Sequence, residues 1–153
     1  MIKEAYEKLK KKHSSLPDFD DLNREFEIES IEKEFFLLRN IRRIIAEKLE
    51  VLMDSLSHVL QPENISISEF YEFRCFDTDT KTMLFNLFKQ LRFNYLKLVK
   101  LDMILDDAKD AEAIKEALKF WKDFRPKMIP YFTEIEQCWN KEYDEKEILG
   151  YLG

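Results

Sequence analysis

Three carboxylates at helical spacing are the first candidates for chemistry. Glu47, Glu50 and Asp54 follow one another by three and four residues, so a helix would present them on one side. Such rows bind Mg²⁺ in helical pyrophosphatases and in di-metal bundles. Neither His13 nor His58 has a glutamate three residues before it, so the Glu-x-x-His pattern of di-iron bundles is missing. The row therefore supports an alternative function, a divalent-metal-dependent nucleotide phosphohydrolase.

The basic stretch RNIRR, residues 39–43, is the second candidate. Arg39 and Arg43 lie four residues apart, with Arg42 beside them. Like charges at this spacing repel each other on a helix, so we expect an acidic group to face them. That group is either intramolecular, such as the acidic segment 24–29 or the aspartates of the sequence DTDT, or external. The external alternative makes these arginines a binding site for an anionic ligand or an acidic partner protein.

Two acidic motifs resemble metal sites but are better explained as helix caps. DDAKD, residues 106–110, has the D-D-x-x-D spacing of magnesium–diphosphate sites, yet the sequence has no second copy of it. We expect Asp110 to cap a helix. DTDT, residues 77–80, lacks the glycine of a calcium loop, and the twelfth position from Asp77 is Phe88 rather than a glutamate. Asp77 or Asp79 should therefore cap the helix that follows.

The cysteines and histidines point to structural roles. Cys75 and Cys138 are far apart and match no metal-binding spacing, so we expect two small buried hydrophobic residues. A bridge between them stays open as the alternative, since some thermophilic proteins carry intracellular disulfides. No motif places a serine or cysteine nucleophile beside His13 or His58, so we do not expect a catalytic triad.

The scarcity of glycine predicts an all-α fold. The chain has 153 residues but only two glycines, Gly150 and Gly153. Strands need glycine for tight turns and bulges, and this chain has almost none to supply. The same scarcity excludes a Gly-rich phosphate loop, a dinucleotide-binding fingerprint and a nucleophile elbow.

Two long amphipathic segments should form the centre of a helical bundle. From Ile31 to Leu60, apolar residues recur every three or four positions, with Phe36, Ile44 and Val51 in a second row. Residues 81–105 show the same pattern, widened by Phe85, Val99 and Met103. Because the two segments are similar in length, we predict an antiparallel pair, with the first helix ending before Pro62.

Shorter helices should pack around this pair. They are expected at residues 2–12, 18–29, 66–76, 110–124 and 130–143, with a break at Arg125–Pro126. Ser66 and Glu69 form a capping box, and so do Asp144 and Glu147. We predict one domain over residues 1–153, with residues 1–13 as a loosely docked N-terminal helix.

The stretch SEFYEFRCFDTDT, residues 68–80, combines four aromatic residues, a cysteine and four carboxylates. Phe70 and Phe73 are three residues apart, and Tyr71 and Cys75 are four apart, so the aromatic residues share one broad side of a helix. The stretch is predicted to be structural, with Phe70, Phe73 and Phe76 mainly buried.

Composition limits the function. The net charge of −6 argues against nucleic-acid binding, which depends on phosphate neutralisation. No apolar run is long enough to span a bilayer, and the charged N-terminus is unlike a signal peptide. We therefore expect a cytoplasmic protein that binds neither nucleic acid nor membrane, and abundant Glu and Lys with little Gln hint at thermostability.

The combined pattern favours a non-catalytic protein without a cofactor. The chain has thirteen Phe, six Tyr and two Trp, and aromatic residues are enriched at interfaces as well as in cores. Short helices cannot cover the whole length of two long ones. We therefore expect an interaction or scaffolding protein that forms a homodimer.

Overall fold

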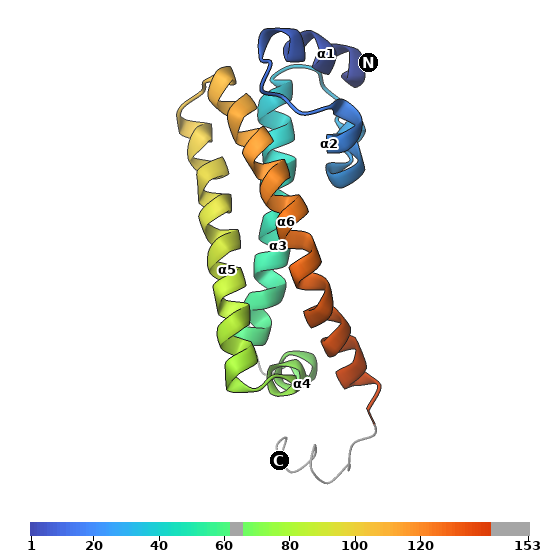
Figure 1. The fold of residues 1–153 in the computed structure, drawn as a ribbon, viewed down its shortest axis with the longest axis vertical. Helices are drawn as coiled ribbons and strands as arrows, with labels where there is room; N and C mark the ends of the chain where they lie inside the picture. Colours follow the sequence, from blue (N-terminus) through green and yellow to red (C-terminus); the bar gives the residue numbers. More distant parts are fainter. Residues whose placement is uncertain (62–65, 142–153) are drawn as a thin grey trace.

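The computed structural model describes residues 1–61 and 66–141, and in that part of the chain it contains only helices and their connections (Figure 1). The predicted all-α helical bundle is confirmed. The α-helices are α1 (Ile2–Lys12), α2 (Phe19–Phe26), α3 (Leu37–Leu60), α4 (Ile67–Cys75), α5 (Thr78–Val99) and α6 (Asp107–Trp139). Two short 3₁₀ helices, η1 (Ile28–Ser30) and η2 (Lys100–Met103), follow α2 and α5.

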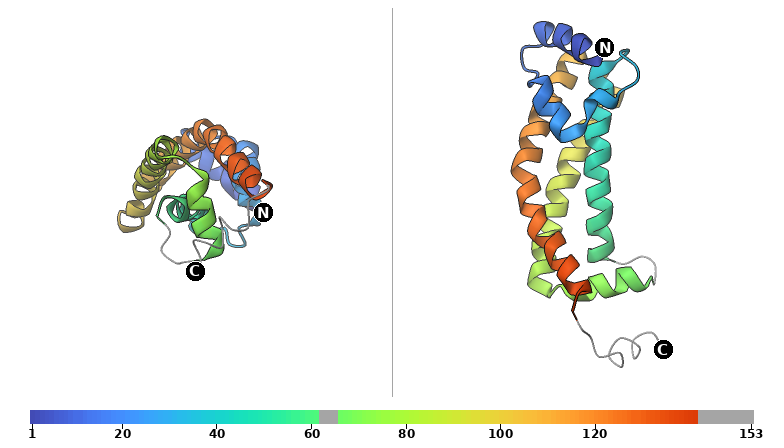
Figure 2. Two further views of the ribbon diagram at one scale, coloured as in Figure 1. Left: turned by 90° about the horizontal axis from the view of Figure 1, so that it is seen from below. Right: turned by 90° about the vertical axis from the view of Figure 1, so that its right-hand side faces the viewer.

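The long helices α3, α5 and α6 form the body of the bundle. The chain runs along α3, returns antiparallel along α5, and reverses again along α6 (Figures 1 and 2). Apolar residues at spacings of three and four line the inner side of each helix. They include Leu49 and Leu56 of α3, Leu84 and Leu91 of α5, and Trp121 of α6, all within one buried cluster. The predicted antiparallel pair is therefore present, with a third long helix packed against it.

Helix α6 contradicts the predicted break at Arg125–Pro126. It continues for 33 residues through Pro126 and Pro130. Both prolines lie on the exposed side of the helix, so the backbone carbonyls that lose their N–H partners can be hydrated. On the inner side the apolar stripe continues in register, with Phe124 and Met128 both buried. Packing of this stripe against α3 stabilises a helix that local propensity would end.

The start of α3 also differs from the prediction. The helix begins at Leu37 rather than Ile31, after Phe36 adopts a left-handed backbone conformation with φ 55°. Phe35 and Phe36 are exposed, and so is Val51 further along the helix. The apolar spacing of these residues was compatible with a helix, but the chain turns before α3 and leaves both phenylalanines outside the core.

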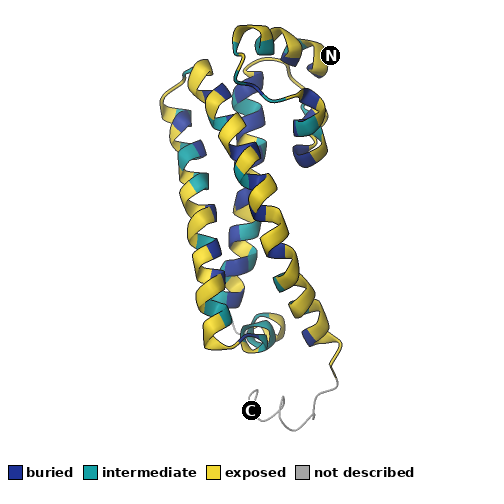
Figure 3. Ribbon diagram, viewed as in Figure 1, coloured by how far each residue is buried: buried dark blue, intermediate teal, exposed yellow. Residues whose placement is uncertain are grey.

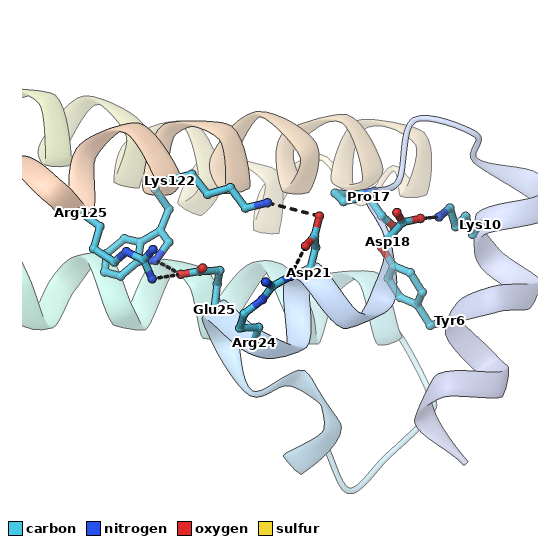
Figure 4. Close-up of polar contacts among 10 residues, drawn as sticks. Tyr6, Lys10, Pro17, Asp18, Asp21, Arg24, Glu25, Lys122 and Arg125 are labelled. Carbon is cyan, nitrogen blue, oxygen red and sulfur yellow. Dashed lines mark hydrogen bonds and ion pairs between the residues drawn. The ribbon is translucent and has the colours of Figure 1, made fainter.

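Helices α1 and α2 pack across one end of the bundle. Tyr6 of α1 is fully buried and donates a hydrogen bond from Oη to the Pro17 carbonyl at 2.8 Å (Figure 4). Since Tyr6 belongs to the common core, α1 is attached more closely than the sequence predicted. Helix α2 lies against α6, where Asp21 forms an ion pair with Lys122 at 3.3 Å (Figure 4).

Helix α4 closes the other end of the bundle and carries one half of a disulfide. Cys75 of α4 is bonded to Cys138 of α6, with 6.1 Å between their Cα atoms. The favoured prediction of two unlinked buried cysteines is wrong, and the alternative is confirmed. The Tyr71 hydroxyl donates to the Cys138 carbonyl at 2.6 Å, and its ring contacts that of Trp139.

The aromatic stretch in α4 is less buried than predicted. Phe76, which follows the helix, is buried against Tyr131, but Phe70 and Phe73 remain partly exposed. Only one side of the short α4 packs onto the ends of the longer helices. For this reason none of the described residues of α4 is buried. The predicted cap at Ser66 is confirmed, since the backbone N–H of Glu69 donates a hydrogen bond to the Ser66 hydroxyl at 3.1 Å. The predicted box at Asp144 and Glu147 lies outside the described residues.

We expect the disulfide to contribute strongly to stability. It closes a loop of 63 residues, and the chain entropy removed from the unfolded state corresponds to about 4 kcal/mol. A Cys75→Ser, Cys138→Ser double variant should therefore lose about 2–4 kcal/mol of unfolding free energy in urea titrations. Wild-type protein with a reducing agent should show the same loss. An unchanged unfolding midpoint under reduction would contradict this role.

Because glycine is scarce, positions with a left-handed backbone conformation are occupied by larger residues. Among the described residues, Glu27, Phe36 and Leu105 have positive φ angles between 54° and 58°. A Cβ atom destabilises this conformation, which Asn tolerates better. Leu105 is exposed, so Leu105→Asn should raise the free energy of unfolding by about 0.5–1 kcal/mol. Met103→Asn is the matched control, because Met103 is exposed nearby and has no positive φ; it should show no gain.

Candidate functional site

Arg42 is the centre of a buried polar cluster at the end of the bundle where α5 and α6 are joined. Its side chain is fully buried, and its guanidinium donates to three acceptors. Nε donates to Asp110 at 2.8 Å, Nη1 to the Leu98 carbonyl at 2.6 Å, and Nη2 to Asp102 at 2.6 Å. These partners come from α6, α5 and η2. The acidic groups that face Arg42 and Arg43 are therefore intramolecular, but they are not the predicted ones.

The two aspartates respond differently to Arg42. The hydrogen bond from Arg42 lowers the pKa of the partly exposed Asp102. Burial raises the pKa of Asp110, and the Arg42 charge only partly offsets that effect. Because the pKa of Asp102 is lower in the folded state, its ionised form stabilises the protein above about pH 4, and this contribution is lost as pH falls further.

The geometry removes Arg42 from the predicted anion- or partner-binding set. A buried guanidinium with three internal acceptors cannot receive an external ligand in this conformation. Arg43 is exposed and forms an ion pair with Asp102 at 3.2 Å, while the Arg39 guanidinium lies 4.8 Å from the centre of the Phe36 ring. Binding of an external anion by Arg39 and Arg43 remains a prediction of the sequence.

The row of carboxylates on α3 is exposed. Glu50 accepts a hydrogen bond from the Tyr95 hydroxyl at 3.4 Å, and Glu47 and Asp54 lie on neighbouring turns. Across residues 1–61 and 66–141, no three His, Cys, Asp or Glu side chains are grouped closely enough to hold a metal ion. The phosphohydrolase alternative therefore gains no geometric support from the described residues.

The acidic motifs act mainly as helix caps. Asp77 accepts a hydrogen bond from the Thr80 N–H at 2.7 Å, which confirms the capping prediction for DTDT. In DDAKD the cap is Asp106, which accepts from the Lys109 N–H at 3.1 Å. The prediction that Asp110 caps the helix is wrong, because Asp110 lies one turn inside α6 and faces Arg42.

A second feature is an uncovered apolar strip between α3 and α6. Helix α2 lies over this seam in the half nearer α1, whereas no helix of the described residues lies over the half nearer α4 (Figure 2, right). A shallow slot there is lined entirely by three helices of the bundle: Ser55, Leu56 and Val59 of α3, Leu84 of α5, and Met128, Tyr131, Phe132 and Ile135 of α6.

Exposed apolar residues border this slot. Val51 lies one turn from Ser55 on α3 and is 65% exposed. Ile129 lies one turn from Phe132 on α6, and these two side chains are 59% and 40% exposed. We call Val51, Ser55, Ile129 and Phe132 the lower seam. Exposed apolar residues concentrated at an unfilled seam are typical of an interaction surface.

A third feature is the side of α5 that faces away from α3. Phe85, Lys89, Phe93 and Leu96 follow one another by four, four and three residues, with Arg92 beside them. Phe85, Phe93 and Leu96 are 51%, 66% and 47% exposed, and the outer side of α5 is coloured as exposed in Figure 3. We call these five residues the α5 outer face.

Comparisons of the chain with protein-family models, with curated proteins and with solved structures find no match. Among the described residues, no helix is both long and apolar enough to cross a membrane. Candidate sites in this protein therefore rest on its own residues and geometry.

Sequence reasoning identified some of these features and missed others. The second apolar row on the α5 segment was recognised through Phe85 and Met103, both of which are exposed. The pairing of Arg42 with Asp110 was missed because the two residues are 68 positions apart. An arginine at an inward-facing position of the α3 stripe, between Ile41 and Ile45, was the available signal.

Loss of Arg42 should be strongly destabilising. Arg42→Leu leaves Asp110 buried without its cation, which typically costs about 3–5 kcal/mol. Adding Asp110→Leu removes the orphaned charge and should recover most of that loss. Arg43→Leu is the control, because its ion pair is exposed and should change stability by less than about 1 kcal/mol. Urea unfolding of the four proteins measures these differences, and equal losses for Arg42→Leu and Arg43→Leu would contradict the role of the cluster.

Proposed function

We propose that this chain is a non-catalytic interaction or scaffolding protein that self-associates through the lower seam. The observation that carries the proposal is the apolar seam between α3 and α6 that no helix of the described chain covers. Its slot is lined by apolar side chains and Ser55, and its borders carry Val51, Ile129 and Phe132. Such a surface can bury hydrophobic area against a partner protein.

The lengths of the helices explain why the seam is open. Helix α2 has 8 residues and spans about 12 Å, whereas the 33 residues of α6 span about 50 Å. Helix α2 is also fixed in place near the N-terminal half of α6. Glu25 accepts a hydrogen bond from Arg125 Nη1 at 2.7 Å (Figure 4). It also accepts one from Trp121 Nε1 at 2.9 Å. A short helix held at this position leaves the lower seam exposed.

The partner that we propose for the lower seam is a second copy of the chain. In a dimer with a two-fold axis, the same patch of each copy contacts its counterpart. A single kind of surface is therefore enough to form the interface. Phe132 and Ile129 of each copy would fill the space that a fourth long helix occupies in a complete four-helix bundle. A stable contact of this type buries at least about 1,200 Å² in total.

Self-association can be tested with substitutions at the seam. Light scattering at micromolar concentration should give about twice the chain mass of 18.6 kDa. Ile129→Asp places a charge at the border of the seam and should yield a monomer without loss of helical content, because Ile129 is mainly exposed. Phe132→Asp should act in the same direction.

Phe35→Asp is the matched control, since Phe35 is exposed and precedes the start of α3, whereas the lower seam lies toward the end of that helix. It should leave the mass at the dimer value. A monomeric wild-type protein up to about 100 µM, or a dimer that survives both seam substitutions, would overturn the proposal. Circular dichroism on each variant separates loss of association from loss of folding.

A further inference from the structure

We propose that the α5 outer face docks an acidic segment of a partner protein that also carries leucine or phenylalanine side chains. This surface is separate from the lower seam. In Figure 1 and in the end-on view of Figure 2, α5 and α2 lie on opposite sides of the bundle. The inference therefore stands whether or not the protein self-associates.

The apolar part of the face is continuous along α5. Phe85, Phe93 and Leu96 lie on the side opposite the buried leucines Leu84, Leu91 and Leu98. Phe85 and Phe93 are both more than half exposed, although neither is needed to complete the core. Exposed aromatic side chains on a rigid helix give a partner a large contact area with little loss of conformational freedom.

The cations on this face have no acidic partner among the described residues. The Lys89 ammonium lies 6.0 Å from the centre of the Phe85 ring, and the Arg92 guanidinium lies 5.4 Å from that of Tyr95. Among the described residues, no carboxylate forms an ion pair with Lys89 or Arg92. These two cations share the face with the exposed rings of Phe85 and Phe93, and together they form the complement of an acidic, apolar peptide.

The distribution of charge identifies the partner as acidic. Helix α5 has four basic residues, Lys81, Lys89, Arg92 and Lys97, and one acidic residue, Asp79, for a net charge of +3. The whole chain has a net charge of −6, so the remainder carries −9. A short acidic segment that stays on α5 meets only the positive face. A nucleic acid or an anionic membrane would extend past α5 and be repelled by the negative charge of the rest of the chain. Both are therefore disfavoured as ligands of this face.

A groove beside the face adds polar contacts. Between α5 and α6, a hollow is lined by Asn86, Gln90 and Asn94 from α5 and by Phe120 from α6, with Lys89 and Phe93 at its edge. The three amides are spaced by four residues; Asn94 Nδ2 donates to the Gln90 carbonyl at 2.9 Å, and the Asn86 and Gln90 amides can donate to carboxylates or to a peptide backbone. A second copy of α5 is disfavoured as the occupant, because an antiparallel pair would bring the positive charges of Lys89 and Arg92 of both copies together.

The probe is a fluorescein-labelled peptide of 18 residues, with leucine at spacings of three and four and glutamate elsewhere. Fluorescence anisotropy with the full chain should show saturable binding that weakens as salt is added. The Lys89→Glu, Arg92→Glu double variant should bind at least tenfold more weakly, and Phe93→Ala should also lose several-fold affinity. The Ile129→Asp variant should bind like wild type, which separates this surface from the lower seam.

Matched controls identify non-specific attraction. Lys119→Glu with Lys127→Glu makes the same change in net charge on exposed positions of α6, and Phe35→Ala removes an exposed ring elsewhere. Both should retain wild-type affinity. Equal weakening by the two charge-reversal pairs, or no binding of the peptide, would overturn the proposal. So would tighter binding of a single-stranded oligonucleotide or of phosphatidylserine vesicles that depends on Lys89 and Arg92, because the ligand would then be a polyanion.

Discussion

The buried guanidinium of Arg42 determines how the three long helices meet. A charge without solvent is tolerated only where acceptors surround it, and here they come from the end of α5, from η2 and from the start of α6. Moving any one of these elements would leave a buried donor or the Asp110 carboxylate unpaired. The cluster therefore specifies the relative positions of α3, α5 and α6 more narrowly than leucine packing alone, which tolerates small shifts.

The opposite end of the bundle is held by a different kind of interaction. There the short α4 contributes few buried contacts, and a covalent bond between Cys75 and Cys138 ties it to α6. Disulfides persist in oxidising compartments and in the intracellular proteins of some thermophiles. One end thus depends on buried electrostatics and the other on a crosslink, with a hydrophobic core between them.

This arrangement also explains where apolar surface is left over. The core of α3, α5 and α6 is complete along one side, while the short α2 covers only part of the seam between α3 and α6. Part of the exposed apolar surface lies at the lower seam and on the outer side of α5, and part lies near the helix ends, as at Phe35 and Leu105. The two surfaces differ in charge, since α5 carries most of its cations on the outside. That difference supports two distinct occupants, a second copy at the seam and an acidic partner at α5.

The sequence by itself determined the helical class and most of the helices. The absence of glycine before Gly150 and the spacing of three and four from Leu37 to Leu60 are local properties, and local properties decide secondary structure when they agree. Caps such as Ser66 and Asp77 were also predictable, because their hydrogen bonds reach only three residues along the chain.

Only the tertiary structure decided the outcomes that depend on distant contacts. Pro126 lies within a helix because packing on its far side outweighs a lost hydrogen bond. Arg42 is internal, and not a ligand site, because Asp102 and Asp110 approach it from 60 and 68 residues away. Phe35 and Phe93 have the same side chain as the buried Phe124, and nothing local distinguishes them. Burial depends on which helix lies alongside, and that depends on the whole chain.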